Sequence, residues 1–415
     1  MRILWIVNML LPEAADYLNV TTSASGSWMI DISQKLADTK NIDLAVACVH
    51  GNQFRKIKVN HITYYLLPGT GKNMLFYTSK YEKLWQKIND DFRPDIVHLH
   101  GTEYSHGLSF LRSCPQVKAI VSLQGLLTRI KDVDLGGIPA HEFLRNRTWS
   151  EMLHLNGVLE LHLLNKKNSE YENEILKRVH YVNGVNTWDI SLAQCINPKL
   201  KTFKLEYNLR DEIYAASKWS INGMQRHLIF SNPGGVPLKG IHQLIKAVAL
   251  LKPKYKDIVL KVPGMGRNGK LEIHGSYEKY LYKLIKKLNV EENVVFLGRQ
   301  TAFQMCENMQ KAHIVVVPSA IESVSMVLRE AMYIGCPSIA SFRGGMADFI
   351  ADKEDGFLYD YQEYSYLAAR IAELFENDDL CIKFSNDAMI KAQKAHDRER
   401  NVSKYIDMYN VVMYD

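Results

Sequence analysis

The six cysteines of this 415-residue chain are scattered, with no CxxC pair and no spacing typical of a zinc site. Most of them lie in apolar runs, such as the one around Cys48. This distribution is typical of reduced cysteines in the core of a cytosolic protein. It argues against a disulfide scaffold and against a zinc module.

Long apolar runs are lacking as well. No run reaches the ~20 residues that a transmembrane helix needs. The N-terminal stretch has a charged start and an apolar run, but it lacks the small-residue cleavage site of a signal peptide. We therefore expect a cytoplasmic protein without a transmembrane helix.

A large excess of one charge is also absent, because the formal net charge is only +6. The chain has no nucleic-acid recognition motif and no block of like charge, so a nucleic-acid partner is not expected. Part of the positive charge lies among aromatic residues in Phe54–Lys87. That mixture would suit contact with the inner face of the plasma membrane, but a solvated face of one hairpin and one helix is the favoured interpretation.

The chain is long enough for two domains, and strand-like and helix-like runs alternate along almost all of it. This alternation predicts an α/β fold with parallel sheets. The strand-like runs fall into two sets, listed here in chain order: Arg2–Met9, Asp43–His50, Asp95–Gly101, Ala119–Gly125 and His180–Asn186, then His227–Pro233, Asp257–Gly264, Asn293–Gly298, His313–Ser319 and Pro337–Gly344. We predict domains over residues 1–212 and 213–395, followed by an amphipathic helix in residues 396–415.

The most informative segment is Val315–Asp348, in which Glu322 and Glu330 have seven residues between them. A buried-looking strand precedes the pair, and the helical run Met326–Ile334 carries the second glutamate. Ligands of open α/β sheets bind at the carboxyl ends of the strands. Backbone amides at a helix start attract phosphate, and a carboxylate can accept hydrogen bonds from ribose. The segment therefore suits a nucleotide.

The order of residues in this segment closely resembles the E-x7-E signature of retaining glycosyltransferases of family 4. The resemblance implies a GT-B fold, in which two Rossmann-like doubly wound domains face each other across a cleft. It implies transfer of a hexose from a nucleoside diphosphate sugar, with UDP favoured, and no other cofactor. The acceptor implied is a saccharide or a lipid-linked saccharide, in surface-polysaccharide biosynthesis.

The resemblance also implies donor-site roles. Glu322 would contact the hexose near the reacting carbon, and Glu330 would accept from ribose. Lys239, in a Lys-Gly pair just before a helical run, would neutralise the diphosphate. Relatives often carry an arginine six residues earlier, where this chain has Pro233. Arg210 and Arg299 are the candidates for that second cation. The other predicted donor-site residues are Ser323, Val324, Ser325, Met326, Gly298 and Gly264.

The first half of the chain is expected to form the acceptor side. Many relatives have a histidine where Gln124 stands, and glutamine cannot take a proton at neutral pH. We assign Gln124 to the catalytic group but exclude general base catalysis by it, which fits a front-face mechanism in which the leaving phosphate accepts the proton. The other predicted acceptor or cleft residues are Ser25, Gly26, His100, Asn208 and Arg210.

Metal binding is not expected. His98 and His100 share a strand face but lack a third ligand at a recognisable spacing. Gly264–Gly269 formally match GxGxxG, yet no helix pattern follows directly, so a nicotinamide dehydrogenase is a weak alternative. A sugar-nucleotide epimerase of related fold and a non-catalytic binding module also stay open.

Overall fold

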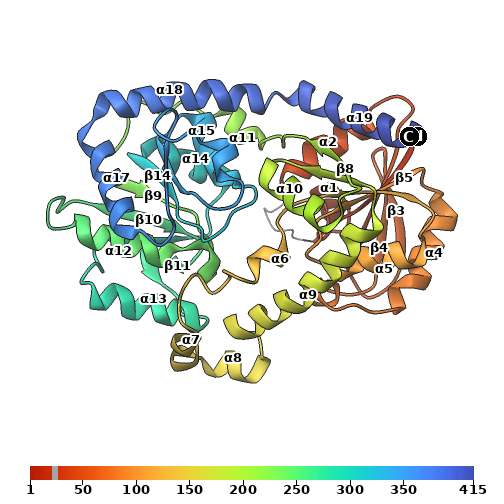
Figure 1. Cartoon of the computed structure of the whole chain (residues 1–415), viewed down its shortest axis with the longest axis horizontal. Coiled ribbons are helices and arrows are strands. Elements are labelled where there is room, and N and C mark those ends of the chain that lie inside the picture. The colour runs from red at the N-terminus through yellow and green to blue at the C-terminus, as the bar shows by residue number, and fades with distance from the viewer. Residues whose placement is uncertain (21–26) are drawn as a thin grey trace. The chain divides into compact units, whose positions relative to one another are not determined.

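The computed structural model describes residues 1–20 and 27–415, and the chain folds into two compact units (Figure 1). The first unit comprises residues 1–129, 164–210 and 396–415, and the second comprises residues 130–163 and 211–395. Each unit contains one large, mostly parallel sheet with helices packed against it. The α/β class predicted from the alternating runs is confirmed.

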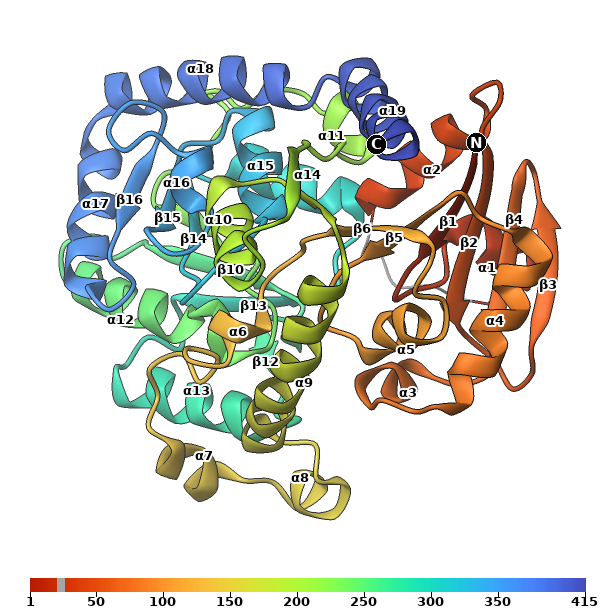
Figure 2. The same cartoon turned by 45° about the vertical axis from the view of Figure 1, so that its right-hand side comes forward.

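The sheet of the first unit has the strand order β3-β4-β2-β1-β5-β6-β7-β8. β3 runs antiparallel to β4 at the edge seen in Figure 2, and the other neighbouring strands are parallel. The strands are β1 (Arg2–Ile6), β2 (Asp43–Val49), β3 (Arg55–Val59), β4 (Ile62–Leu67), β5 (Ile96–His100), β6 (Lys118–Ser122), β7 (Tyr181–Gly184) and β8 (Lys201–Lys204). The winding direction of the chain reverses between β1 and β5.

The helices of the first unit cover this sheet and include the last helix of the chain. They are α1 (Pro12–Tyr17), α2 (Ser27–Ala37), α3 (Gly71–Leu75), α4 (Lys80–Phe92), α5 (Ser105–Ser113), α6 (Leu127–Ile130), α10 (Thr187–Ile196) and α19 (Arg398–Tyr414). On α19, the buried Tyr409 hydroxyl accepts a hydrogen bond from Trp5 Nε1 at 2.9 Å and lies 2.6 Å from His98 Nδ1. These contacts place α19 in the core of the first unit.

The sheet of the second unit is parallel throughout, with the order β13-β10-β9-β14-β15-β16. Its strands are β9 (Leu228–Phe230), β10 (Val259–Pro263), β13 (Val294–Gly298), β14 (Ile314–Val317), β15 (Ser338–Ser341) and β16 (Phe357–Tyr359). Numbered along the chain, this order is the 3-2-1-4-5-6 arrangement of dinucleotide-binding folds. The four β14 residues are apolar and all buried, as expected for a strand covered on both faces.

Helices of the second unit pack on both faces of its sheet, and α12 and α17 lie side by side in Figures 1 and 2. The helices of the second unit, with or without contact to the sheet, are α7 (Ala140–Asn146), α8 (Trp149–His154), α11 (Asp211–Ala215), the 3-10 turn η1 (Pro237–Lys239), α12 (Ile241–Leu251), α13 (Ser276–Lys287), α14 (Ala302–Lys311), α15 (Met326–Ile334), α16 (Met346–Phe349), α17 (Tyr364–Glu376) and α18 (Asp378–Ala395). α9 (Val158–Arg178) begins in the second unit and ends in the first.

Residues 130–163, called the insertion below, pack with the second unit, whereas the sequence predicted a first domain over 1–212. Glu151 accepts hydrogen bonds from the Ser276 backbone amide at 2.9 Å and the Ser276 hydroxyl at 2.8 Å. The His242 ring donates to the Gly136 carbonyl at 2.9 Å. These contacts join positions more than 100 residues apart in the chain, so local sequence patterns carry no sign of them. The later boundary lies at 210/211.

The basic and aromatic segment Phe54–Lys87 is divided between a largely exposed β3 and several buried aromatic side chains. Tyr64, Tyr65, Tyr81 and Trp85 are all buried. Among the cysteines, Cys195 is exposed and the others are buried, and burial raises the pKa of the Cys48 thiol to about 12. No helix within the described ranges is both long enough and apolar enough to cross a membrane.

Candidate donor site and its relatives

The second unit has a pocket where the winding direction of its chain reverses. Because β9 and β14 are neighbours but their connections continue to opposite sides of the sheet, their carboxyl ends leave a crevice. A pocket of about 240 Å³ opens there. Its lining residues follow β9, end β14 or begin α15: Ser231, Asn232, Pro233, Lys239, Val316, Val317, Pro318, Ser319, Glu322, Val324, Ser325, Met326 and Val327.

The charged centre of this pocket is an ion pair between two residues 83 positions apart in the chain. Lys239 Nζ lies 2.8 Å from Glu322 Oε1 and 2.7 Å from Glu322 Oε2. The Glu322 side chain is 10% exposed and that of Lys239 is 33% exposed. A half-buried lysine held by a carboxylate is oriented and still accessible from the pocket.

Gly240 explains how Lys239 reaches Glu322. It adopts φ +71°, and a β-carbon on it would lie 1.7 Å from the Pro318 carbonyl oxygen. Only glycine allows so close an approach between η1 and the end of β14. The Ala320 amide then donates to the Leu238 carbonyl at 2.7 Å, which fixes the two loops side by side. The two residues of the Lys-Gly pair thus act together, because Gly240 allows the close approach that brings Lys239 to Glu322.

A second glycine holds the backbone of Glu322. The Gly345 amide donates to the Glu322 carbonyl at 2.8 Å. Gly344 adopts φ +72°, and a β-carbon there would lie 2.2 Å from the Glu322 carbonyl oxygen. The Gly344–Gly345 turn after β15 therefore supports the loop that carries the first glutamate, a role that the spacing of residues alone does not reveal.

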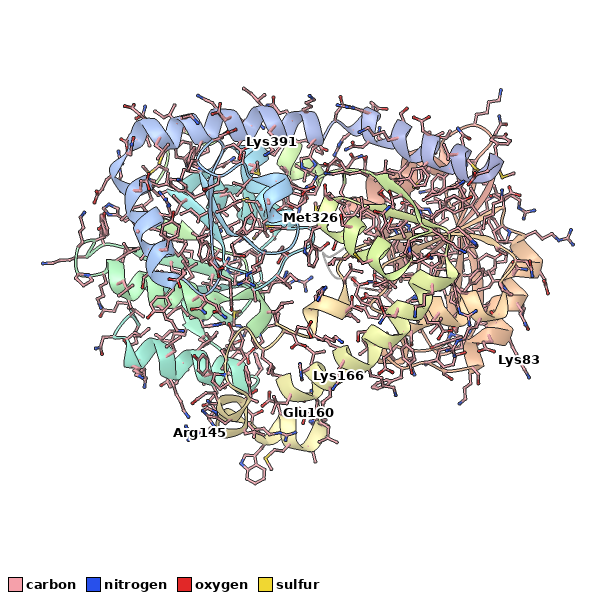
Figure 3. All side chains as sticks on the ribbon, viewed as in Figure 1. Lys83, Arg145, Glu160, Lys166, Met326 and Lys391 are labelled. Atoms are coloured by element: carbon pink, nitrogen blue, oxygen red, sulfur yellow. The ribbon has the colours of Figure 1, made fainter. Side chains whose placement is uncertain are left out.

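The start of α15 supplies backbone donors to the same pocket. Ser325 is the N-cap residue, and its hydroxyl accepts from the Leu328 amide at 3.3 Å. Met326, labelled in Figure 3, is the first residue of the helix. Val324, Ser325 and Met326 line the pocket, and Ser323 lies just before them with 9% exposure. A helix start of this kind attracts anions.

Glu330 lies in the second turn of α15 and is fully buried. It is not among the lining residues of the pocket, which end at Val327. The second glutamate of the E-x7-E pair is thus buried on α15 and does not line this pocket. Its assignment to ribose stays a prediction.

Gly264 and Gly298 end neighbouring strands and lie together, because the Gly264 amide donates to the Gly298 carbonyl at 2.7 Å. Neither is among the lining residues, and Arg299 beside them is exposed. The stretch after Gly264 forms the antiparallel hairpin of β11 (Gly266–Arg267) and β12 (Lys270–Leu271). A dinucleotide fingerprint would open a helix at this point, so the hairpin disfavours the dehydrogenase alternative.

On the first unit, His100 and Gln124 lie at the carboxyl ends of β5 and β6. Both ring nitrogens of His100 and the Gln124 Nε2 are buried without a hydrogen-bond partner among the residues described. Burial between Trp5 and Trp28 lowers the pKa of His100 well below its usual value, so the ring is neutral. Ser25 and Gly26, also predicted here, lie outside the described residues.

Glu103 belongs to the same edge and was missed by sequence reasoning. Its Oε2 is buried without a hydrogen-bond partner in the described part of the chain. A β-carbon on Gly101 would lie 2.3 Å from this oxygen and 3.6 Å from Gln124 Cδ, so the two side chains flank one glycine. Burial raises the pKa of Glu103 to about 7, and the nearby carboxylates Glu172 and Asp189 add to the shift. The sequence signal that could have identified Glu103 is its position three residues after the end of β5.

Asn208 and Arg210 were predicted for the acceptor side, and that assignment stays a prediction. Asn208 is fully buried, donates to Asp31 on α2 and accepts from Asn401 on α19 at 3.0 Å. Its side-chain amide therefore links α2 and α19 within the first unit. Arg210 is half-buried, at the residue where the chain leaves the first unit. Neither Arg210 nor Arg299 lines the pocket, whose described lining has Lys239 as its cation.

Within the described ranges, no group of three or more histidine, cysteine, aspartate or glutamate side chains is placed to hold a metal ion. The metal-independent chemistry predicted from the sequence stays a prediction.

Comparison with known proteins agrees with this geometry. Residues 217–391 match the family model described as glycosyl transferases group 1. This segment is therefore similar to the group 1 glycosyl transferases. It contains the whole of the pocket described above, including both members of the Lys239–Glu322 pair.

The curated relatives match less than half of this chain. A D-inositol 3-phosphate glycosyltransferase of Corynebacterium urealyticum is 29% identical over 172 residues, which is 41% of this chain and 40% of the relative. The match thus spans less than half the length of that relative.

Solved structures show the fold over the whole chain. Sucrose-phosphate synthase from Thermosynechococcus elongatus aligns with a TM-score of 0.75 at 14% identity, covering 100% of this chain and 99% of its own. The Anabaena protein HepE in complex with UDP-glucose aligns with a TM-score of 0.67 at 18% identity, covering 99% and 100%. At these identities the likeness establishes the GT-B type of fold, as predicted.

Proposed function

We propose that this protein is a retaining hexosyltransferase. It moves a hexose from a nucleoside diphosphate sugar, with UDP favoured, to a saccharide or lipid-linked saccharide acceptor in surface-polysaccharide biosynthesis. The observation that carries this proposal is the Lys239–Glu322 ion pair, set in a pocket at the switch point beside the start of α15. The HepE structure with UDP-glucose supports UDP as the nucleotide.

The donor's diphosphate would bind between Lys239 Nζ and the amides at the start of α15. A diphosphate competes with Glu322 for the ammonium group, so donor binding loosens the ion pair. The Glu322 carboxylate then becomes available to the hexose, next to the reacting carbon. Glu330 would accept from ribose.

In the reaction, the bond between the anomeric carbon and the diphosphate oxygen breaks, and an acceptor hydroxyl forms a new bond on the same face. The hydroxyl proton passes to the leaving diphosphate, so no protein base is needed and no metal ion is invoked. Lys239 stabilises the charge that develops on the leaving group, and Glu322 stabilises the positive charge on the hexose. Preorganised charges of this kind are usually the largest catalytic contribution.

The first unit would bind the acceptor through polar atoms that have no partner in the described chain. His100, Glu103 and Gln124 gather such atoms at one sheet edge. Sugar hydroxyls both donate and accept, which matches a neutral ring, a carboxyl group and an amide. Ser25 and Gly26 are proposed for the same side.

A non-catalytic binding module is the second candidate. The described lining of the pocket carries one cation, Lys239, where relatives often supply two, and a diphosphate held by a single cation is less well stabilised. A sugar-nucleotide epimerase is a third reading, because it would use the same donor pocket without an acceptor.

The first test is a thermal-shift screen of nucleoside diphosphate sugars, each followed by an assay for nucleoside diphosphate release with oligosaccharide acceptors. A ligand at one hundred times its Kd stabilises the folded state by about 2.7 kcal/mol. We expect a UDP-hexose to raise Tm by several degrees and to release UDP only when an acceptor is present.

Each other outcome would identify a different function or refute part of the proposal. Conversion of the nucleotide sugar without an acceptor would identify an epimerase, and binding without release would identify the binding module. Proton NMR of the product fixes the anomeric configuration. An inverted product would refute the retaining mechanism, and no stabilisation by any sugar nucleotide would refute the donor site.

A further inference from the structure

Glu172 is a fully buried carboxylate to which the proposed function gives no role. It lies on the part of α9 that belongs to the first unit. Its Oε2 accepts hydrogen bonds from the Thr102 hydroxyl at 2.6 Å and from the Leu127 amide at 3.0 Å. Its Oε1 accepts from the amide and the hydroxyl of Thr128, both at 2.9 Å. The carboxylate therefore joins the loop after β5 to the start of α6.

The two segments joined in this way carry polar groups proposed for the acceptor. Thr102 directly precedes Glu103 in the loop after β5. Gln124 lies three residues before Leu127, between the end of β6 and the start of α6. The side chains of Glu103 and Gln124 flank Gly101, and each has a buried polar atom without a partner among the described residues. A shift of either segment would therefore change the distance between these two side chains.

A second residue of α9 holds the loop after β5. Asn168 lies one turn before Glu172, so both side chains are on one face of the helix. Asn168 is buried, and its Nδ2 donates to the Glu103 carbonyl at 3.4 Å. The backbone of Glu103 is thus held from α9, whereas its Oε2 has no partner among the residues described. The helix fixes the loop and leaves this side-chain oxygen to a ligand.

The four hydrogen bonds require a carboxylate at position 172. Burying a carboxylate costs free energy, and burial raises the pKa of Glu172 even though its hydrogen bonds oppose the shift. Each of its oxygens accepts from one backbone N–H. A glutamine in either orientation would point its NH2 group at one of these N–H groups. The neutral amide therefore cannot hold both segments as the carboxylate does.

We propose that Glu172 is a positioning residue for the acceptor, which sets the distance between Glu103 and Gln124 by holding the loop after β5 against the start of α6. The inference rests on the proposed function, because that function assigns the acceptor to these two side chains. Loss of the carboxylate should weaken the use of the acceptor and leave UDP binding unchanged. The reason is that the residues lining the donor pocket all belong to the second unit.

The test compares Glu172→Gln with Glu151→Gln. Glu151 is a matched control, because it is also a buried carboxylate that accepts from two backbone amides and two hydroxyls, those of Thr148 and Ser276. We expect Glu172→Gln to raise KM for the oligosaccharide that supports UDP release about tenfold, with kcat changed by less than about threefold. Kd for UDP should not change. Glu151→Gln should keep the wild-type KM.

Hydrogen–deuterium exchange of the ligand-free variants tests whether Glu172 holds the two segments. Glu172→Gln should speed amide exchange in residues 101–105 and 126–130, and Glu151→Gln should not. Unchanged exchange in either segment, or an equal rise of KM in both variants, would overturn the proposal. Failure of the wild-type protein to transfer hexose to any oligosaccharide would instead refute the proposed function, and the exchange would still decide whether Glu172 holds the segments.

Thr102→Val provides the test if Glu172→Gln does not fold. The substitution keeps the shape of the side chain and removes the hydroxyl that donates to Glu172. KM for the same oligosaccharide should rise about threefold, the effect of one lost hydrogen bond, with Kd for UDP again unchanged. A wild-type KM in this variant would overturn the proposal.

Discussion

Replacing Lys239 with alanine is expected to lower the rate of hexose transfer by about 10²–10³-fold, the size of effect seen when one preorganised charge-stabilising donor is removed. Nζ of Lys239 is the cation that the described lining of the pocket offers to the leaving diphosphate, so no neighbouring lining group replaces it. The loss should appear mainly in kcat, because charge on the leaving group grows as the bond breaks. Steady-state kinetics of UDP release measures it.

The matched control is Lys246→Ala, at a half-buried lysine on α12 outside the pocket, which should keep wild-type kinetics. Lys239→Ala also leaves Glu322 without its partner. Because Glu322 is buried, the free energy of unfolding should fall by about 1–3 kcal/mol. A variant that folds and transfers hexose at the wild-type rate would remove Lys239 from the mechanism.

Glu330→Gln is expected to weaken nucleotide binding by about 10–100-fold. The substitution keeps the shape of a fully buried side chain on α15 but removes its charge. Hydrogen bonds to a charged group contribute about 1.5–3 kcal/mol, which is the effect expected if the carboxylate accepts from both ribose hydroxyls. Isothermal titration calorimetry with UDP measures the affinity.

A ligand-side control separates this contact from a general loss of structure. The 2′,3′-dideoxy analogue of UDP lacks the hydroxyls, so wild type and Glu330→Gln should bind it equally. If the variant weakens the binding of UDP and of the analogue by the same factor, Glu330 acts on the structure of α15 and not on ribose.

Much of the second unit could be predicted from the sequence, because its strands and helix starts are marked by patterns of neighbouring residues. The apolar runs around β9, β10, β13, β14 and β15 mark buried parallel strands, and the segment after β14 marks a helix start. What the sequence could not give was the close packing between distant parts. A β-carbon on Gly240 would lie 1.7 Å from the Pro318 carbonyl oxygen, and the Gly344–Gly345 turn supports Glu322. Both contacts join loops that meet only in the folded protein.

In the first unit and the insertion, several tertiary contacts could not be predicted from the sequence. Asn208 matched a promising segment, yet its amide is used to join α2 to α19. Glu103 was overlooked, because a carboxylate after a strand is common and only burial without a partner distinguishes this one. The insertion was assigned to the wrong domain, since its anchors Glu151 and Gly136 find their partners more than 100 residues away. Each of these three features depends on a tertiary contact.

The central claim is that the pocket between the ends of β9 and β14 holds the nucleotide sugar. Hydrogen–deuterium exchange of the wild-type protein, with and without the most stabilising nucleotide sugar, tests it directly. The account predicts slower amide exchange in residues 231–240 and 320–330 when the ligand is bound. Unchanged exchange in both segments under saturating ligand, with protection elsewhere in the chain, would contradict it.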